Sequence, residues 1–191
     1  MLCFCVKIGG EPLLVVEKKV FGIGVYAQHC AGCHTLHGQG EAHAPDLDRW
    51  ASRSWIDAFL AAPDAPRFFG HTEIHGMKPV MVEGADRIAL IEWLWAQGGA
   101  EGSDAAKVKA GEAMFDGLGC TDCHEKDGTS GGSGVPNLGG RASADWLKQL
   151  FVDPGADHLY GKKNQMPRFG SKLSPVETEA LVELLRAERL R

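Results

Sequence analysis

The chain has no long hydrophobic run: none of its 191 residues belongs to a stretch of 18 consecutive apolar side chains. A helix that crosses a bilayer needs about 20 predominantly apolar residues, so the sequence predicts no membrane-spanning segment. The chain also lacks a basic excess, since 20 lysines and arginines face 25 acidic residues and the formal net charge is −5. Nucleic-acid binding would require a basic stripe, so we expect no nucleic-acid partner.

Cysteine is scarce but patterned. Four of the six cysteines form two C-x-x-C-H motifs, Cys30-Ala-Gly-Cys33-His34 and Cys120-Thr-Asp-Cys123-His124. This is the attachment motif of c-type haem. The two thiols add to the porphyrin vinyl groups, and the histidine that follows offers Nε2 to the iron. We therefore predict two covalently attached haem c groups, with His34 and His124 as iron ligands.

Structural zinc is the main alternative, because two CxxC pairs can build a Cys₄ site. Zinc ribbons separate their pairs by about 15–20 residues, whereas Cys33 and Cys120 stand 87 positions apart. Zinc also leaves the histidine after each pair unexplained. The remaining cysteines, Cys3 and Cys5, are poorly placed for a disulfide with each other, and we assign them no role.

An internal repeat of about 90 residues organises the chain. From Pro45 to Gly70, and again in the last helix of each half, equivalent residues stand a constant 91 positions apart. Equivalent pairs include Pro45 and Pro136, Trp55 and Trp146, Pro63 and Pro154, Phe69 and Tyr160, and Ala89 and Ala180. Chance similarity would not hold this register across such different residue types, so the sequence predicts two units of similar architecture.

Each half is predicted to form three helices. The first leads into the CxxCH motif, and in the second half Ser103 or Asp104 caps it. The second begins at Ser54 or Ser143 and buries aromatic and aliphatic side chains on one face. The third is clearest at Ser174-Pro175-Val176-Glu177, a capping box with proline at the first helical position.

No strand pattern competes with these helices, so the predicted fold class is all-α. The repeat and a glycine-rich linker divide the sequence into four parts. We predict an N-terminal tail at 1–19, a first haem domain at 20–98, a linker at 99–104 and a second haem domain at 105–191.

On these motifs both halves resemble the cytochrome c family, across most of the chain. The resemblance implies two tandem three-helix domains, each folded around one haem. It implies that Gly22 and Gly111 let the first helix of a domain cross the last one closely. It also implies that the carbonyls of Pro45 and Pro136 accept a hydrogen bond from Nδ1 of the iron-binding histidine, which fixes the tautomer of that ligand.

The resemblance further implies a distal methionine ligand on each iron. Met166 stands before a proline and just ahead of the last helix, as in the family motif, and is expected on the second iron. Met77 is the best candidate for the first iron, although its loop has two extra residues and a lysine before the proline. His71 and His75 are rival ligands there. Met81 falls out of register and is expected to pack against haem or helix.

Four side chains are candidate hydrogen-bond donors to haem propionates: Trp50, Trp55, Trp146 and Arg141. Trp55 and Trp146 lie on apolar helical faces, which favours a place in the core.

Iron with two protein ligands passes electrons but offers no open position, so this ligand set predicts a single-electron carrier rather than an enzyme. The residues Phe68-Phe69-Gly70 and Leu159-Tyr160-Gly161 look like those of the tandem haem domains in bc-type quinol:cytochrome c oxidoreductase complexes. That resemblance implies redox-protein partners in a respiratory chain, including a membrane quinol-oxidising complex. The alternatives are a free-standing two-haem cytochrome, a two-haem peroxidase or other small-molecule oxidoreductase with an openable first haem, and a gas or redox sensor.

Bacteria attach haem c outside the cytoplasmic membrane, so we expect the chain in the periplasm or on the outer face of that membrane. No secretory leader is recognisable, however, because Lys7, Glu11 and Pro12 interrupt any apolar core between Met1 and Val16. A removed signal or anchor, a larger parent polypeptide and a mis-assigned start are the open explanations.

Overall fold

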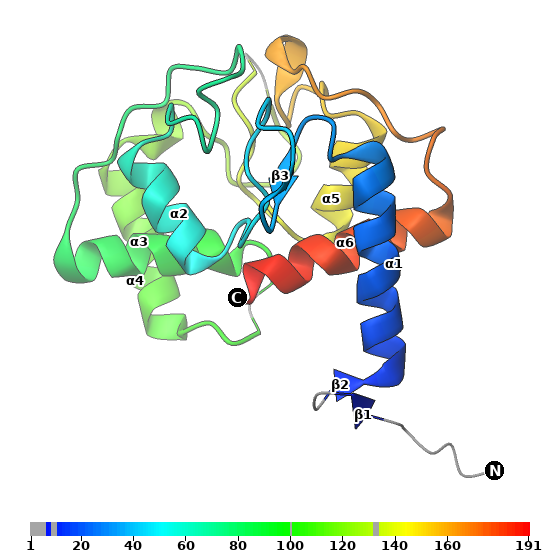
Figure 1. Ribbon diagram of the computed structural model, residues 1–191. Helices are drawn as coiled ribbons and strands as arrows, with labels where there is room; N and C mark the ends of the chain where they lie inside the picture. Colours follow the sequence, from blue (N-terminus) through cyan, green and yellow to red (C-terminus); the bar gives the residue numbers. More distant parts are fainter. Residues whose placement is uncertain (1–6, 9–10, 100, 132–133) are drawn as a thin grey trace.

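The computed structural model describes residues 7–8, 11–99, 101–131 and 134–191. Within them the regular secondary structure is mostly helical, as predicted, with six α-helices and two short 3₁₀ helices (Figure 1). These are α1 (Leu13–His29), α2 (Arg53–Ala61), α3 (Gly84–Ala96), α4 (Ala105–Gly117), η1 (Cys120–Asp122), α5 (Ala144–Val152), η2 (Gly161–Lys163) and α6 (Pro175–Arg189). Helix α1 thus extends into the predicted tail, whereas Cys3 and Cys5 lie outside the described residues.

Four two-residue strands, which the sequence did not predict, form two antiparallel pairs in the described part of the chain. Strand β1 (Lys7–Ile8) pairs with β2 (Glu11–Pro12), and β3 (Thr35–Leu36) pairs with β4 (Gln39–Gly40). The second pair is a tight hairpin directly after the first CxxCH motif. Its two loop residues, His37 and Gly38, both have positive φ, the geometry that two-residue hairpin turns require.

Side-chain caps fix where the helices start. Asp104 caps α4, and Ser174 forms the predicted capping box at the start of α6. Ser143 caps α5 as expected, but α2 is capped by Ser52 rather than starting at Ser54. Ser52 and Ser143 stand 91 positions apart, and each hydroxyl accepts a hydrogen bond from the backbone N–H three residues later.

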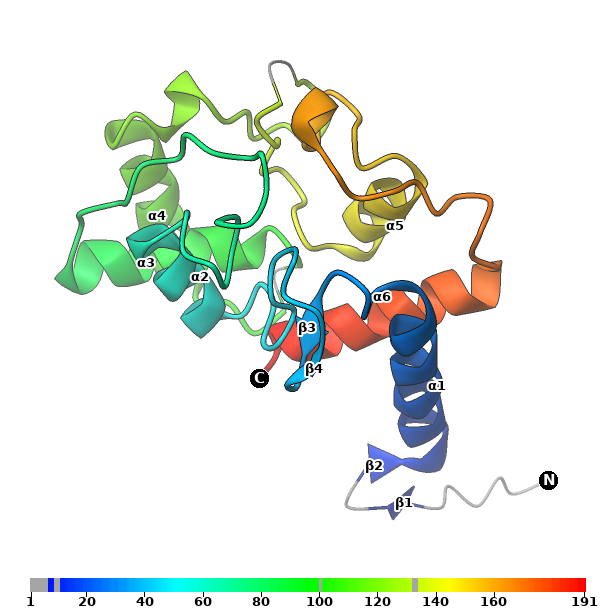
Figure 2. The same ribbon diagram turned by 45° about the horizontal axis from the view of Figure 1, so that its top comes forward.

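The helices pair across the two halves of the sequence. Among the described residues, the most extensive helix contacts join α1 to α6 and α3 to α4. Figures 1 and 2 show α6, in red, crossing α1, in blue, while α3 and α4 lie together at the other end of the molecule. The family resemblance implied that each first helix crosses the last helix of its own domain. In the structure each one crosses the last helix of the opposite half.

Two glycines make these crossings close. A Cβ atom on Gly22 of α1 would lie 2.7 Å from the backbone oxygen of Ala180 in α6. A Cβ atom on Gly111 of α4 would meet the backbone oxygen of Ala89 in α3 more closely still. Only glycine permits this backbone approach. The expected glycine crossings are therefore present, with the partner helices exchanged.

The hydrophobic core is continuous between the halves. Trp50 stacks on Trp146 with ring centroids 6.1 Å apart, and Phe69 packs against Tyr160 at 5.8 Å. Phe69 and Tyr160 are equivalent positions of the predicted repeat. Direct contact between equivalent residues is what a two-fold relation between two similar units produces.

A buried carboxylate joins three of the helices. Glu92 of α3 binds the guanidinium of Arg53 from α2 through two hydrogen bonds of 2.6 and 2.7 Å. It also accepts the backbone N–H of Asp104, the cap of α4, at 2.9 Å. The hydrogen bonds from Arg53 hold the pKa of Glu92 below its ordinary value. The same guanidinium lies 3.6 Å from the centre of the Trp95 ring.

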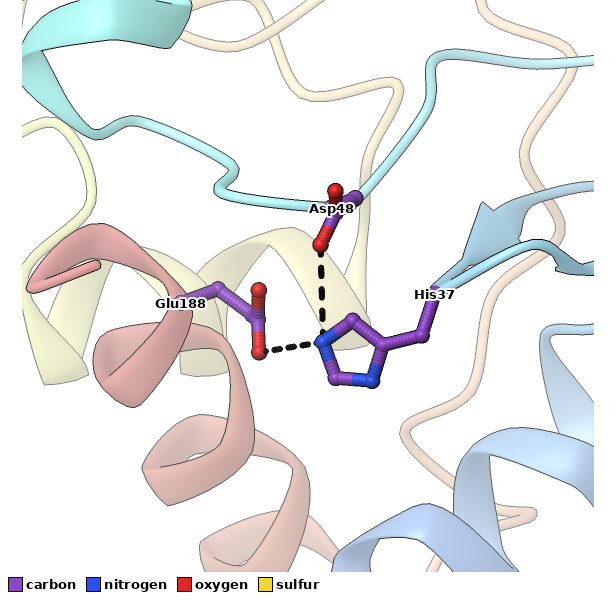
Figure 3. A group of neighbouring side chains, drawn as sticks. All are labelled: His37, Asp48 and Glu188. Atoms are coloured by element: carbon purple, nitrogen blue, oxygen red, sulfur yellow. Dashed lines mark hydrogen bonds and ion pairs between the residues drawn. The ribbon is translucent and has the colours of Figure 1, made fainter.

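An ion-pair network ties the loop after the first motif to the end of α6. The Nε2 atom of His37 lies 2.9 Å from a carboxylate oxygen of Glu188 and 3.5 Å from one of Asp48 (Figure 3). Three such donors could hold a metal ion. However, a guanidinium nitrogen of Arg191 lies 2.5 to 2.8 Å from all three side chains and supplies the positive charge. We therefore describe the group as a clasp between the halves.

Candidate haem-binding sites

The first CxxCH motif turns sharply at the end of α1. The backbone oxygen of Tyr26 accepts the N–H groups of Cys30 and Ala31, and the oxygen of Cys30 accepts the N–H of His34 at 2.9 Å. The Tyr26 hydroxyl donates to the His34 carbonyl at 2.6 Å. This turn brings both thiols and the imidazole of the motif to the wall of one cavity. The second motif folds similarly, with η1 beginning at Cys120.

Both motif histidines bind a proline carbonyl. Nδ1 of His34 lies 2.7 Å from the oxygen of Pro45, and Nδ1 of His124 lies 2.8 Å from that of Pro136, as the resemblance implied. A carbonyl can only accept, so each Nδ1 carries the hydrogen and each Nε2 keeps its lone pair. Burial lowers the pKa of both histidines, which favours the neutral ring that a metal requires.

The side chain of the residue after each proline accepts hydrogen bonds from neighbouring loop residues, a contact that sequence reasoning missed. Asp46 accepts the hydroxyl of Thr35 at 2.9 Å, next to the first motif. Asn137, almost fully buried, accepts the backbone N–H groups of Gly128 and Gly139, each at 2.9 Å. The repeated Pro-Asp-Leu and Pro-Asn-Leu triplets were the available signal, because both place a side-chain acceptor directly after the proline.

The first cavity measures about 440 Å³ and has Cys30, Cys33 and His34 in its wall. Much of the remaining wall comes from the second half of the chain. That half contributes Met166 and apolar side chains of α5 and α6: Leu147, Leu150, Phe151, Leu181, Leu184 and Leu185.

The second cavity measures about 610 Å³ and has Cys120, Cys123 and His124 in its wall. Here the remaining wall comes largely from the first half. That half contributes Met77 and apolar side chains of α2 and α3: Ile56, Phe59, Leu60, Leu90 and Leu94.

The cavities do not group the methionines as the sequence analysis expected. It expected Met77 on the iron of His34 and Met166 on the iron of His124, whereas in the structure Met166 lines the cavity of His34 and Met77 lines the cavity of His124. The reason is the helix exchange. The loop with Met166 runs directly into α6, which packs on α1, and the loop with Met77 runs into α3, which packs on α4.

Equivalent hydrogen bonds anchor the two methionine loops. The N–H of Val80 donates to the oxygen of Leu60 in α2 at 2.8 Å, and the N–H of Phe169 donates to Phe151 in α5 at 2.7 Å. The two extra residues of the first loop are therefore absorbed before Val80. The side chain of Asn164 additionally bonds both the N–H and the carbonyl of the methionine two residues later, at 3.0 and 2.7 Å.

The two histidines that were considered as rival iron ligands line different cavities. His71 is exposed and lines the first cavity, whereas His75 lines the second, where its Nδ1 lies 3.3 Å from a carboxylate oxygen of Asp64. Met81 was expected to pack against haem or helix. Its side chain is 91 % exposed, which rules out packing against a helix, and it lies at the edge of the second cavity, where packing against a haem stays a prediction.

Arg141 lies between the two cavities and lines both. Its guanidinium is 5.5 to 5.9 Å from the ring centres of Trp50, Trp55 and Trp146. Among the described residues no carboxylate pairs with it. The indole N–H of Trp55 donates to a backbone oxygen, but that of Trp146 is buried without a partner in the described part of the chain. Both features fit a bound anion such as a haem propionate.

The described residues fit a haem better than zinc. The two cysteine pairs line different cavities, and the three-donor cluster found in the described ranges is His37, Asp48 and Glu188, which contains no cysteine. Both cavities lie within the range of about 300–1,000 Å³ usual for small-molecule and cofactor sites. Each combines largely apolar walls with two thiols, a neutral imidazole and a thioether sulfur, the donor set of a covalently held porphyrin iron.

Comparisons with known proteins agree with this donor set. Residues 22–97 match the family model described as Cytochrome c, and residues 106–185 match the model for cbb3-type cytochrome c oxidase subunit III. Subunit CcoP of the cbb3-type cytochrome c oxidase of Helicobacter pylori strain 52 is 25 % identical over 186 residues, covering 90 % of this chain and 59 % of that protein. CcoP of strain ATCC 700392 / 26695 is also 25 % identical, over 183 residues, covering 88 % and 59 %.

The chain therefore spans about three fifths of the length of the curated relatives it matches. No solved structure gives a significant match. In the part of the chain that the structure describes, no helix combines the length and the apolar character needed to cross a bilayer.

Proposed function

Because the chain carries two cytochrome c domains in tandem, we propose that it binds two haem c groups covalently and relays single electrons between redox partners. The observation that carries this proposal is the repeated site: a CxxCH turn, an imidazole held by a proline carbonyl, and a methionine across a cofactor-sized cavity. A bound haem would supply the one-electron couple. The chain supplies neutral nitrogen and thioether ligands, apolar walls and fixed loops.

A wall shared by the two cavities supports transfer within the molecule. Five side chains line both cavities: Trp55, Phe69, Ile74, Arg141 and Tyr160. The methionine loops also touch, since the N–H of Glu73 donates to the side chain of Gln165 at 3.1 Å. Two redox centres separated by one layer of packed side chains can exchange electrons without a second protein.

We place this carrier on the outer side of the cytoplasmic membrane, as part of a respiratory complex. The sequence pointed to a quinol-oxidising complex of the bc type, whereas the matched relatives are named as subunits of a cbb3-type oxidase. The similarity to these relatives favours the oxidase as the partner complex, with the bc type as the alternative.

The direct test of the proposal counts haems on the protein. Denaturing gels should keep haem stain on the chain, and the double substitution Cys120→Ala, Cys123→Ala should halve the haem bound per protein. A preparation with about one zinc ion and no haem would contradict the proposal.

Visible spectroscopy separates the carrier from the two-haem peroxidase. A carrier should have two six-coordinate low-spin haems in both oxidation states and negligible turnover of peroxide, because a methionine closes each site. A high-spin haem in the unmodified protein, together with peroxide turnover, would favour the enzyme.

A further inference from the structure

The clasp of His37, Asp48 and Glu188 also carries the donors of a metal site that is separate from the haem cavities. Its imidazole and two carboxylates come from three places in the chain: the β3–β4 hairpin, the loop before α2 and the last turn of α6. The three side chains line neither of the two cavities. Binding of the proposed haems therefore makes no use of them.

The donor atoms already stand at the separations found in a metal coordination shell. Nε2 of His37 lies 2.9 Å from a carboxylate oxygen of Glu188 and 3.5 Å from one of Asp48 (Figure 3). In a tetrahedral shell, zinc bonds of about 2.0–2.2 Å to nitrogen and oxygen put neighbouring ligand atoms about 3.3–3.6 Å apart. The other ring nitrogen of His37 points away from both carboxylates, so it can carry the imidazole hydrogen and leave Nε2 its lone pair.

Arg191 holds the place of the cation among these donors. Its Nη1 atom lies 2.5 Å from Nε2 of His37, 2.8 Å from an oxygen of Asp48 and 2.7 Å from an oxygen of Glu188. The three donors therefore converge on one point, and a positively charged group stands at that point.

A guanidinium nitrogen fits this position imperfectly. Nη1 carries two hydrogens but faces three acceptors, so one of them is left without a partner. If His37 instead carries its hydrogen on Nε2 and donates it to Glu188, two N–H groups face each other across 2.5 Å. A divalent metal ion satisfies all three donors at once, after each distance to the centre shortens by about 0.5 Å.

Burial and donor type indicate which ion suits the cluster. The side chain of Glu188 is 4 % exposed, whereas those of His37, Asp48 and Arg191 are 40 %, 36 % and 44 % exposed. One side of the cluster thus faces water, so Arg191 can swing out and a water molecule can complete the shell. Imidazole together with carboxylates suits zinc, whereas calcium and magnesium prefer shells made of oxygen alone.

We propose that His37, Asp48 and Glu188 form a zinc site that joins the two halves of the chain, with Arg191 as the cation that zinc displaces. His37 and Asp48 belong to the first half and Glu188 to the second. Bound zinc fixes the hairpin after the first CxxCH motif to α6, whose apolar side chains line the first cavity. None of the three ligands is a cysteine, so this site is not the Cys₄ site that the spacing of the cysteine pairs argues against.

Zinc titration of the two-haem protein tests the proposal. Cys3→Ser and Cys5→Ser are introduced throughout, so that these two thiols bind no zinc. Isothermal titration calorimetry with zinc chloride should give one zinc ion per chain. Zinc at 100 times its dissociation constant should raise the midpoint of thermal unfolding by about 5–10 °C. If the protein binds no zinc, the proposal is wrong, and the two-haem carrier is unaffected.

A histidine substitution locates the site. His37→Asn removes the imidazole but leaves an Asn-Gly turn, which suits the positive φ of this position, so the hairpin should still form. It should weaken zinc binding by more than about 100-fold, because even the outer-shell partners of metal ligands are worth 10–100-fold. His158→Asn is the matched control, since this histidine pairs with Gln149 outside the cluster and both cavities, and it should change nothing. Equal zinc affinity in the two variants would overturn the assignment.

The displacement of Arg191 has a test of its own. Arg191→Gln removes the competing cation and should tighten zinc binding by about tenfold or more, because like charges a few ångströms apart repel strongly. An unchanged or weaker affinity would show that zinc does not take the place of the guanidinium. X-ray absorption at the zinc edge should show nitrogen and oxygen ligands, whereas sulfur ligands would assign the ion to a cysteine site and reject the cluster.

Discussion

Gly22 and Ala180 stand 158 positions apart in the sequence, yet a Cβ atom on Gly22 would lie 2.7 Å from the Ala180 carbonyl oxygen. This contact joins α1, which leads into the first CxxCH motif, to α6. The apolar face of α6 that lines the first cavity, including Leu181 and Leu184, depends on this crossing.

Because the helices cross so closely at Gly22, we expect that adding a single methyl group there lowers the stability of the fold. Gly22→Ala should lower the free energy of unfolding by about 1–3 kcal/mol, because the new methyl group forces two backbones apart. Gly24→Ala is the matched control, since a Cβ atom there has open space in the same helix. It should be neutral or stabilise by about 0.5–1 kcal/mol, the usual gain from replacing a helical glycine. Chemical denaturation of both variants measures the difference, and equal effects would contradict the close crossing.

The hydrogen bonds that Glu92 accepts from Arg53 and Asp104 predict that the stability of the fold depends on pH. The hydrogen bonds of Arg53 depress the pKa of Glu92 in the folded chain, so Glu92 stabilises the fold when it is ionised. This contribution is complete above the pKa of an unfolded glutamate, about 4.3, and is lost as the pH falls through the lower folded-state pKa. Glu92→Gln should therefore destabilise the protein at pH 7 but converge with the unmodified protein in acid. A constant difference across this pH range would show that the charge of Glu92 is not involved.

Arg141 should affect both redox centres at once. Its guanidinium lines both cavities, so its positive charge disfavours the extra charge of each oxidised iron. An interaction of about 1 kcal/mol corresponds to about 40 mV for a one-electron couple, so Arg141→Gln should lower both haem potentials by that order. Lys109→Gln removes a charge from an exposed position that lines neither cavity and serves as control. Redox titration that shows only one shifted potential would contradict the shared position.

The clasp at Glu188 should contribute more stability than a surface ion pair. Glu188 is buried and accepts hydrogen bonds from the side chains of His37 and Arg191 and from the backbone of Arg49. Glu188→Gln should cost about 1–3 kcal/mol, because it removes the anionic partner of Arg191 and places an amide N–H₂ against donors from which the carboxylate now accepts. Asp153→Asn breaks a pair with Arg168, whose side chain is 74 % exposed, and should cost less than about 1 kcal/mol. Urea unfolding compares the two, and similar costs would show that burial of Glu188 adds nothing.

Local features of the candidate sites were predictable because each one depends on a short segment of the sequence. The CxxCH turns, the bonds from His34 to Pro45 and from His124 to Pro136, and the cap at Ser174 each depend on residues close in sequence. The motif and the cap were predictable from the residues themselves, whereas the two histidine–proline bonds were implied by the family resemblance.

The exchange of helices was not predictable in this way, because the repeat predicted from the sequence treats the two halves as interchangeable. Ala89 and Ala180 are equivalent, so either last helix offers the same small surface to Gly22 or Gly111. One signal did exist. Only eight residues separate the end of α3 at Ala96 from the start of α4 at Ala105, and short connections favour packing between consecutive helices.

Because each cavity takes its walls from both halves of the chain, the two cavities are completed at different times during synthesis. Synthesis proceeds from the N-terminus, so α1 and the first CxxCH motif emerge long before α6, which closes the cavity beside them. The second motif, in contrast, emerges after α2 and α3 have already been made. The earliest attachment site is thus the last to be sealed, and a chain that loses its final helix should fail first at the haem nearest its beginning.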